Sequence, residues 1–77
     1  MFAITLGGVK LTGDDIDFVS PEDEDGNETD DFINAYGYRV TLMDSGWDKA
    51  GAAEIYVTRE ELDGTTYELL LEIIQPI

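Results

Sequence analysis

The chain has 77 residues with neither cysteine nor histidine, and its 18 carboxylates against 4 basic residues give a net charge of −14. A single domain of this length has a thin core, and no disulfide or thiolate metal site can stabilise it. The usual general base, the thiolate nucleophile and most transition-metal ligands are missing as well. We therefore expect one non-enzymatic domain over residues 1–77, with no cofactor and no metal site.

Apolar residues make up 43% of the chain and include eight aromatic side chains, too many for a disordered acidic tail. No run approaches the roughly 20 apolar residues of a membrane span, and the N-terminus lacks the basic and long apolar regions of a signal peptide. We expect a folded cytoplasmic protein that does not bind membranes.

The first elements are predicted by alternating apolar residues. Phe2–Leu6 and Val9–Leu11 flank Gly7-Gly8, a pattern typical of two strands joined by a two-residue turn. Ile16 and Phe18 then alternate with aspartates, which predicts a short strand with one buried face and one acidic face. Residues 20–31 contain no aliphatic or aromatic side chain and are predicted to form an acidic, solvated loop.

The middle of the chain is ambiguous. Tyr36, Tyr38, Val40 and Leu42 recur at every second position and indicate a strand with these residues on its buried face. Residues 30–36 could instead form a short helix that ends at Gly37. Residues 44–51 contain Gly46 and Gly51 around a single tryptophan, so they are predicted to form a loop.

The last third favours a second hairpin. Ala53–Glu60 and Thr65–Ile74 are rich in residues that favour strands, and Asp63-Gly64 between them is typical of a type I′ turn. Such a turn would place Arg59 opposite Glu68, and Pro76 would end the final strand. The alternative is a short helix before Gly64, because Thr58-Arg59-Glu60-Glu61 fits a capping box.

Together these patterns predict an all-β fold, a small antiparallel meander or partly closed barrel of five to six strands. The alternative is an α+β fold with a short helix near residues 30–36.

Ten carboxylates fall between residues 14 and 31, with no Lys or Arg among them: Asp14, Asp15, Asp17, Glu22, Asp23, Glu24, Asp25, Glu28, Asp30 and Asp31. We call residues 14–31 the acidic segment. Like charges at this density repel one another and cost stability, which indicates that they have a use. The ten carboxylates are our candidate partner-binding residues, and Trp47 is added as an aromatic anchor.

Asp23-Glu24-Asp25-Gly26-Asn27 looks superficially like part of a calcium-binding EF-hand loop, with Gly26 at the position of its invariant glycine. The alignment puts Pro21 and Phe32 at positions that require carboxylates, so the EF-hand pattern fails. Weak, irregular calcium binding remains an alternative because oxygen ligands are plentiful.

Direct nucleic-acid binding is disfavoured, because the acidic segment would repel phosphates. A protein that normally binds phosphates with Lys and Arg would accept carboxylates in their place. In size, charge and lack of catalytic residues, the chain resembles the small acidic DNA-mimic inhibitors that phages use against restriction and CRISPR systems. The resemblance implies a monomeric or dimeric inhibitor that binds a basic nucleic-acid-binding protein of a host defence system.

Three alternatives stay open. The chain could be a small virion or tail assembly protein whose strand edges pair with neighbours. The acidic residues could form a solvated loop of no specific use, or they could reflect a halophilic host.

Overall fold

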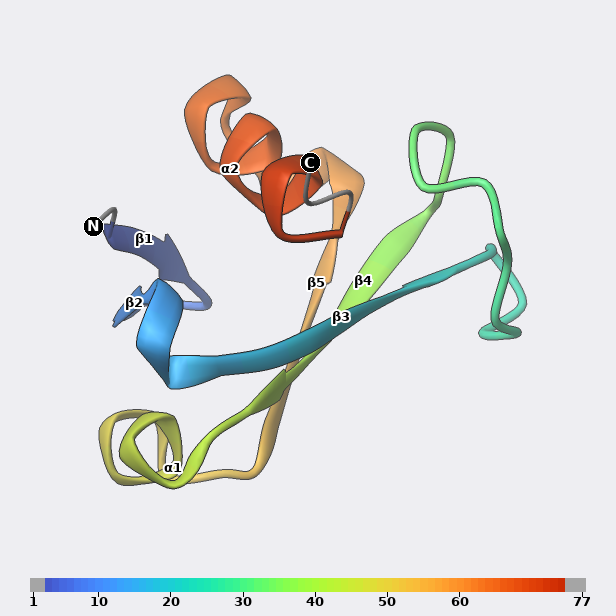
Figure 1. The fold of residues 1–77 in the computed structure, drawn as a ribbon. Helices are drawn as coiled ribbons and strands as arrows, with labels where there is room; N and C mark the ends of the chain where they lie inside the picture. Colours follow the sequence, from blue (N-terminus) through green and yellow to red (C-terminus); the bar gives the residue numbers. More distant parts are fainter. Residues whose placement is uncertain (1–2, 75–77) are drawn as a thin grey trace.

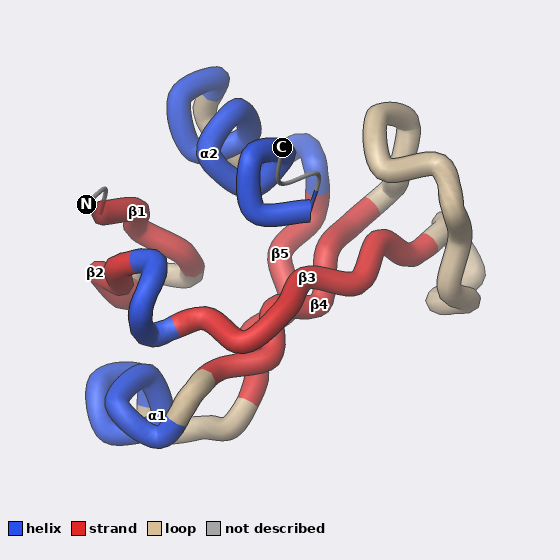
Figure 2. Tube along the Cα trace, viewed as in Figure 1, coloured by secondary structure: helices blue, strands red, loops and turns tan. Residues whose placement is uncertain are grey.

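The computed structural model describes residues 3–74 and has an α+β fold (Figure 1). The described residues form a two-stranded sheet of β1 and β2 and a three-stranded sheet in the order β3-β4-β5, both antiparallel. The elements are β1 Ala3–Leu6, β2 Val9–Thr12, β3 Ile16–Glu22, β4 Gly37–Leu42, α1 Asp44–Ala50, β5 Glu54–Thr58 and α2 Gly64–Ile74. The prediction of an all-β meander or barrel is therefore wrong, because two predicted non-helical segments are helices (Figure 2).

The predicted N-terminal hairpin is confirmed for its described residues. Ile4 pairs with Leu11 and Leu6 pairs with Val9. Gly7 and Gly8 have φ angles of 55° and 84°, as both central residues of a type I′ turn require. Phe2 lies outside the described residues.

The three-stranded sheet has one buried face. Two rows of paired residues point inward: Val19, Val40 and Ile55, followed by Pro21, Tyr38 and Val57. They pack with Ile4, Leu6 and Leu11 of the hairpin and Leu70 of α2 in one hydrophobic core. The hairpin and α2 therefore cover the same side of the sheet (Figure 1).

The start of β3 differs from the prediction. Asp15 ends a 3₁₀ turn, η1 (Gly13–Asp15), and is buried, whereas Asp17 lies where the pairing register of β3 shifts and is exposed. The two aspartates therefore do not share one acidic strand face. The physical reason is that Asp15 still belongs to η1, and the bulge between Ile16 and Phe18 turns Phe18, predicted to be buried with Ile16, to the exposed side.

The predicted loop over residues 20–31 begins three residues later than expected, because Ser20, Pro21 and Glu22 belong to β3. Residues 23–31, hereafter the 23–31 loop, are irregular and largely exposed apart from one isolated β-bridge between Glu28 and Glu22. Residues 30–36 form bends and no helix. The α+β alternative therefore gave the correct fold class but placed the helix in the wrong segment.

Residues 44–50 form α1 where the sequence predicted a loop. Gly46 is buried in this helix, and a Cβ atom there would lie 2.6 Å from the Asp15 carbonyl oxygen. The glycine that suggested a loop is thus required for close packing of α1 against η1. Gly51 ends the helix with a φ of 71°.

The predicted C-terminal hairpin is also wrong, because Gly64 begins α2 and its φ is not positive. Asp63 caps this helix: its Oδ1 accepts a hydrogen bond of 2.7 Å from the Thr66 backbone N–H, which lowers the Asp63 pKa. Tyr67, Leu70 and Ile73 recur at helical spacing and pack on the core.

The alternative of a short helix before Gly64 is confirmed as a 3₁₀ turn, η2 (Arg59–Glu61). The Thr58 backbone N–H and hydroxyl both donate to Glu61 Oε1, at 3.0 and 2.7 Å, and these bonds lower the Glu61 pKa. Pro76 lies outside the described residues.

Candidate functional site

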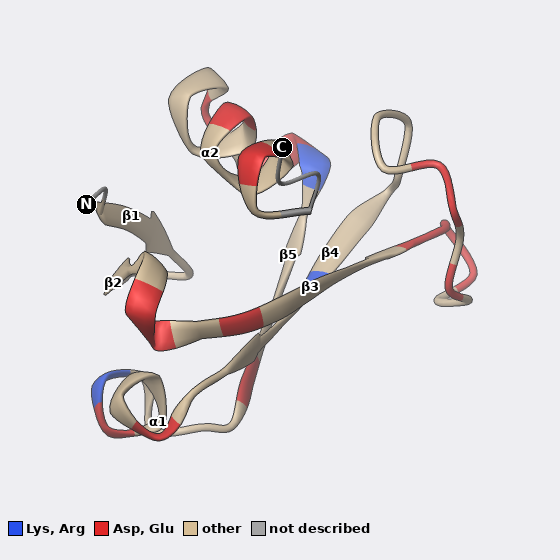
Figure 3. Ribbon diagram, viewed as in Figure 1, with Lys and Arg blue, Asp and Glu red and all other residues tan. Residues whose placement is uncertain are grey.

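The carboxylates of the acidic segment lie at two separate places. Asp14, Asp15 and Asp17 lie where η1 meets β3, beside α1. Glu22 and the six carboxylates of the 23–31 loop lie at the far end of β3 (Figure 3). The sequence suggested one continuous cluster, but residues 18–21 of β3 separate its two parts.

Asp15 is a structural carboxylate, only 2% exposed. Its Oδ2 accepts hydrogen bonds from Lys49 Nζ and the Thr12 backbone N–H, at 2.7 and 2.8 Å, and its Oδ1 accepts one of 2.7 Å from the Ser45 hydroxyl. The Lys49 contact, followed by the Thr12 and Ser45 bonds, holds the pKa of Asp15 far below its ordinary value. This carboxylate joins η1 to α1 and is not available to a partner.

Glu22 is also buried by internal contacts. Its two oxygens accept bonds of 2.7 and 3.3 Å from Nε and NH2 of Arg39, whose NH1 donates to Glu54 at 2.8 Å. These bonds raise the pKa of Arg39 above its ordinary value. One guanidinium thus links one carboxylate from each neighbouring strand.

Two carboxylates of the 23–31 loop organise its backbone. Asp23 Oδ1 accepts from the backbone N–H groups of Asp25 and Asn27, at 2.9 and 3.0 Å. Asp31 accepts from the backbone and the side-chain amide of Asn34, at 3.1 and 3.2 Å. Such short-range bonds fix turns in exposed segments.

The four remaining carboxylates of the loop, Glu24, Asp25, Glu28 and Asp30, are exposed. The ion pairs found within residues 3–74 use Arg39 and Lys49 and involve none of these four. The loop that carries them is attached to the sheet: Thr29 N–H donates to the Pro21 carbonyl at 3.1 Å, and the Tyr38 hydroxyl donates to the Phe32 carbonyl. They are therefore charged groups on an anchored loop.

The outward face of the three-stranded sheet, hereafter the open face, lies opposite the core. Phe18 and Tyr56 on this face are 51% and 39% exposed. Arg39 pairs directly with Tyr56 in the same row, with its guanidinium carbon 5.3 Å from the Tyr56 ring centroid. The paired rows of the open face are Phe18, Thr41, Glu54; Ser20, Arg39, Tyr56; and Glu22, Gly37, Thr58.

The Tyr56 ring lies across Gly37 of the neighbouring strand. A Cβ at position 37 would overlap the Tyr56 hydroxyl and would come within 3.0 Å of the Val57 carbonyl oxygen. Burial, followed by the nearby charge of Glu22, raises the pKa of Tyr56 above its ordinary value. Gly37 therefore fixes where this aromatic ring lies on the open face.

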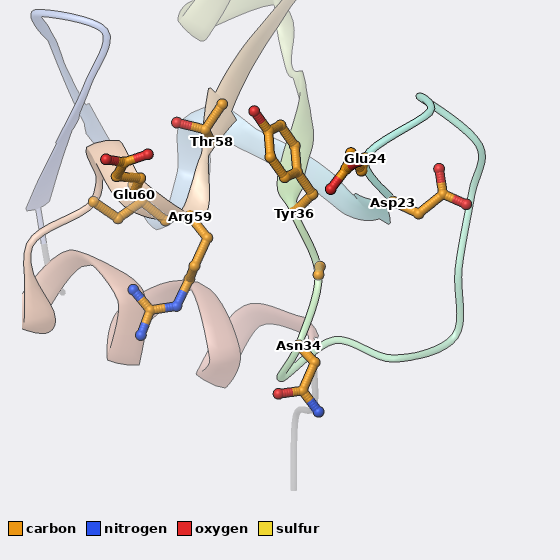
Figure 4. Close-up of a pocket in the computed structure, with 9 residues that line it drawn as sticks. Asp23, Glu24, Asn34, Tyr36, Thr58, Arg59 and Glu60 are labelled. Carbon is orange, nitrogen blue, oxygen red and sulfur yellow. The ribbon is translucent and has the colours of Figure 1, made fainter.

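A pocket of about 530 Å³ connects the 23–31 loop to the end of the open face (Figure 4). Glu24, Tyr36 and Thr58 line it, and Ala35 and Leu62 add apolar surface. The Arg59 guanidinium lies 3.6 Å from the centroid of the Tyr67 ring of α2.

Trp47, a predicted contact residue, lies on α1 and is 47% exposed. Its indole N–H donates to the Leu42 carbonyl at 2.8 Å, which fixes one end of the ring against β4. Trp47 therefore shares α1 with Lys49, the partner of Asp15, and is not part of the 23–31 loop.

Sequence reasoning missed the open face. Alternation along β4 places Arg39 and Thr41 opposite Tyr38 and Val40, and this signal was readable. Placing Phe18 and Tyr56 on either side of Arg39 needed the pairing of three strands. Tyr36 was expected to be buried with Tyr38, yet it precedes β4 and is 50% exposed.

The described part of the chain contains no group of three or more Asp or Glu residues arranged to hold a metal ion. Within the same residues, no helix is long and apolar enough to cross a membrane. Comparison with known proteins found no matching family model, and no curated protein or solved structure matched either.

Proposed function

We propose that this chain is a non-enzymatic inhibitor that binds the basic nucleic-acid-binding surface of another protein, of the anti-restriction or anti-CRISPR kind. The exposed carboxylates of the 23–31 loop take the place of nucleic-acid phosphates. The partner contributes Lys and Arg side chains, and no nucleic acid takes part in the complex.

One observation carries this proposal. Nine consecutive residues, 23–31, hold six carboxylates and no basic residue; five of the six are exposed, and none belongs to an ion pair within residues 3–74. Their mutual repulsion costs stability, while the same charges attract a cationic surface. Because the loop is anchored to β3 and held by its own turns, little ordering is needed on binding.

The test is affinity capture with matched charge variants. Immobilised wild-type protein is exposed to a lysate of the host cell, and bound proteins are identified and challenged with duplex DNA. The loop variant carries Glu24→Gln, Glu28→Gln and Asp30→Asn. We expect the captured protein to bind nucleic acid, to be displaced by duplex DNA and by salt, and to bind the loop variant at least about tenfold more weakly.

The control variant carries Glu68→Gln, Glu72→Gln and Asp48→Asn, which remove the same number of exposed charges from α1 and α2. It should bind as tightly as wild type. The proposal fails if the two variants bind equally well, or if the captured protein is not displaced by DNA.

The second candidate function is an assembly subunit, and it is favoured by β5, which lies at one edge of the three-stranded sheet. Pairing of that edge between copies would give oligomers of the purified chain. Sedimentation of wild-type protein separates the two proposals, because the inhibitor is expected to remain a monomer or dimer.

A further inference from the structure

We infer that the open face docks an amphipathic basic segment of the partner protein, with Phe18 and Tyr56 as its aromatic contacts. This inference rests on the proposed function, because it extends the surface on which the 23–31 loop supplies the charge. It assigns to the partner an apolar contact in addition to its basic residues.

The first argument is the contrast between the two faces of one sheet. The inward rows pack with Leu70 of α2 and with the hairpin, whereas the outward rows leave Phe18 half exposed and Tyr56 more than one-third exposed. Aromatic side chains that bury area at little entropic cost are enriched at binding hot spots. A partner that covered Phe18 and Tyr56 would gain hydrophobic contact that the charged loop cannot provide.

The second argument is the charge of this face. Its one described cation, Arg39, is held between Glu22 and Glu54, so two carboxylates oppose one guanidinium. Adding the 23–31 loop beside Glu22 makes the surroundings strongly negative. A second copy of this chain, itself at −14, would be repelled, whereas a basic segment would be attracted.

The third argument is that the face and the loop are continuous. Glu22 ends one row of the open face and forms a β-bridge with Glu28 of the loop. Thr58 ends the same row on β5 and lines the pocket that it shares with Glu24 and Tyr36. One extended segment can therefore contact the aromatic side chains and the loop carboxylates at once.

The test uses two synthetic peptides of equal length and equal arginine content, in which arginine alternates with leucine in one and with serine in the other. Each is titrated into ¹⁵N-labelled protein and followed by NMR. We expect the leucine peptide to shift the amide resonances of Phe18, Thr41 and Tyr56 together with those of the 23–31 loop. It should bind about tenfold more tightly than the serine peptide.

Two variants examine the face itself. Phe18→Ala should remove most of the tenfold preference for leucine. Thr41→Lys places a cation between Phe18 and Glu54 and should also remove most of the preference for the leucine peptide. It provides a second variant of the open face in case Phe18→Ala does not fold. The matched control is Ile33→Ala: Ile33 is 60% exposed, but its carbonyl accepts a 3.1 Å bond from Tyr67 of α2, which places it away from the open face.

The outcomes distinguish this inference from the proposed function. Equal binding of both peptides, or shifts confined to the loop, overturns the inference and leaves the proposed function standing. If the loop variant binds both peptides as tightly as wild type, the charge-based function fails. If wild type self-associates and Phe18→Ala abolishes that association, the face belongs to a second copy and the inference is overturned.

Discussion

The two ends of β3 use the same kind of side chain for different purposes. At the start of the strand, Asp15 is buried and accepts bonds from three residues, including Lys49. Beyond its end, the 23–31 loop presents Glu24 and Asp30 to solvent with no ion pair among the described residues. The position of the few basic residues thus decides which carboxylates stabilise the fold and which are available to a partner.

The largest effect is expected at the buried end. Asp15→Asn removes the charge that Lys49 neutralises and weakens the link between η1 and α1, so the melting temperature should fall by several degrees. Asp14→Asn is the matched control, because Asp14 is the exposed neighbour and should leave the melting temperature nearly unchanged. If the two variants have the same melting temperature, Asp15 does not stabilise the fold as this comparison requires.

The same variant predicts a pH dependence. Because the pKa of Asp15 in the folded protein lies below its ordinary value of 3.8, its stabilising effect is fully present above that value and is lost as the pH falls toward the lower pKa. The difference in melting temperature between wild type and Asp15→Asn should therefore be greatest near neutral pH and shrink below about pH 4. A difference that stays constant or grows on acidification would contradict the assigned role.

These contrasts explain how far the sequence could predict the molecule. The β1–β2 hairpin and the alternation of Tyr38, Val40 and Leu42 in β4 depend on neighbouring residues, and both were predicted correctly, whereas Tyr36 lies before the strand and is exposed. The burial of Asp15 depends on Lys49, 34 residues further along, so no local pattern could reveal it. The net charge of the acidic segment was readable, but its division into two places was not.

The predictions for the α1 and α2 segments were wrong for a related reason. Gly46 normally argues against a helix, yet here it allows α1 to approach the Asp15 carbonyl. The apolar residues from Thr65 to Ile74 fit both the two-residue period of a strand and the 3.6-residue period of a helix. Asp63-Gly64 suggested a turn between strands, whereas Asp63 caps a helix. The inner face of the sheet is buried by packing against α2, and this tertiary contact cannot be predicted from the local sequence.

A smaller effect on stability is expected at Glu22, which is buried like Asp15 but pairs with a partly exposed arginine. Glu22→Gln removes one charge from a contact whose Arg39 partner is partly exposed and still paired with Glu54, so the free energy of unfolding should fall by about 1 kcal/mol. Chemical denaturation measures this loss. Glu54→Gln, on the more exposed side of Arg39, should cost less than Glu22→Gln, and the reverse order would show that burial does not rank these carboxylates.

The smallest effect on stability is expected in the loop, and its sign is opposite. The variant with Glu24→Gln, Glu28→Gln and Asp30→Asn relieves repulsion without removing a core contact, so its free energy of unfolding should be unchanged or raised by no more than about 0.5 kcal/mol. Added salt should raise the melting temperature of wild type more than that of the variant, because less repulsion is left to screen. Thermal melts across a salt series measure both effects. If three neutral side chains in the loop cost as much stability as the single Asp15→Asn change, the loop carboxylates are structural, and the charge assigned to a partner is already used within the fold.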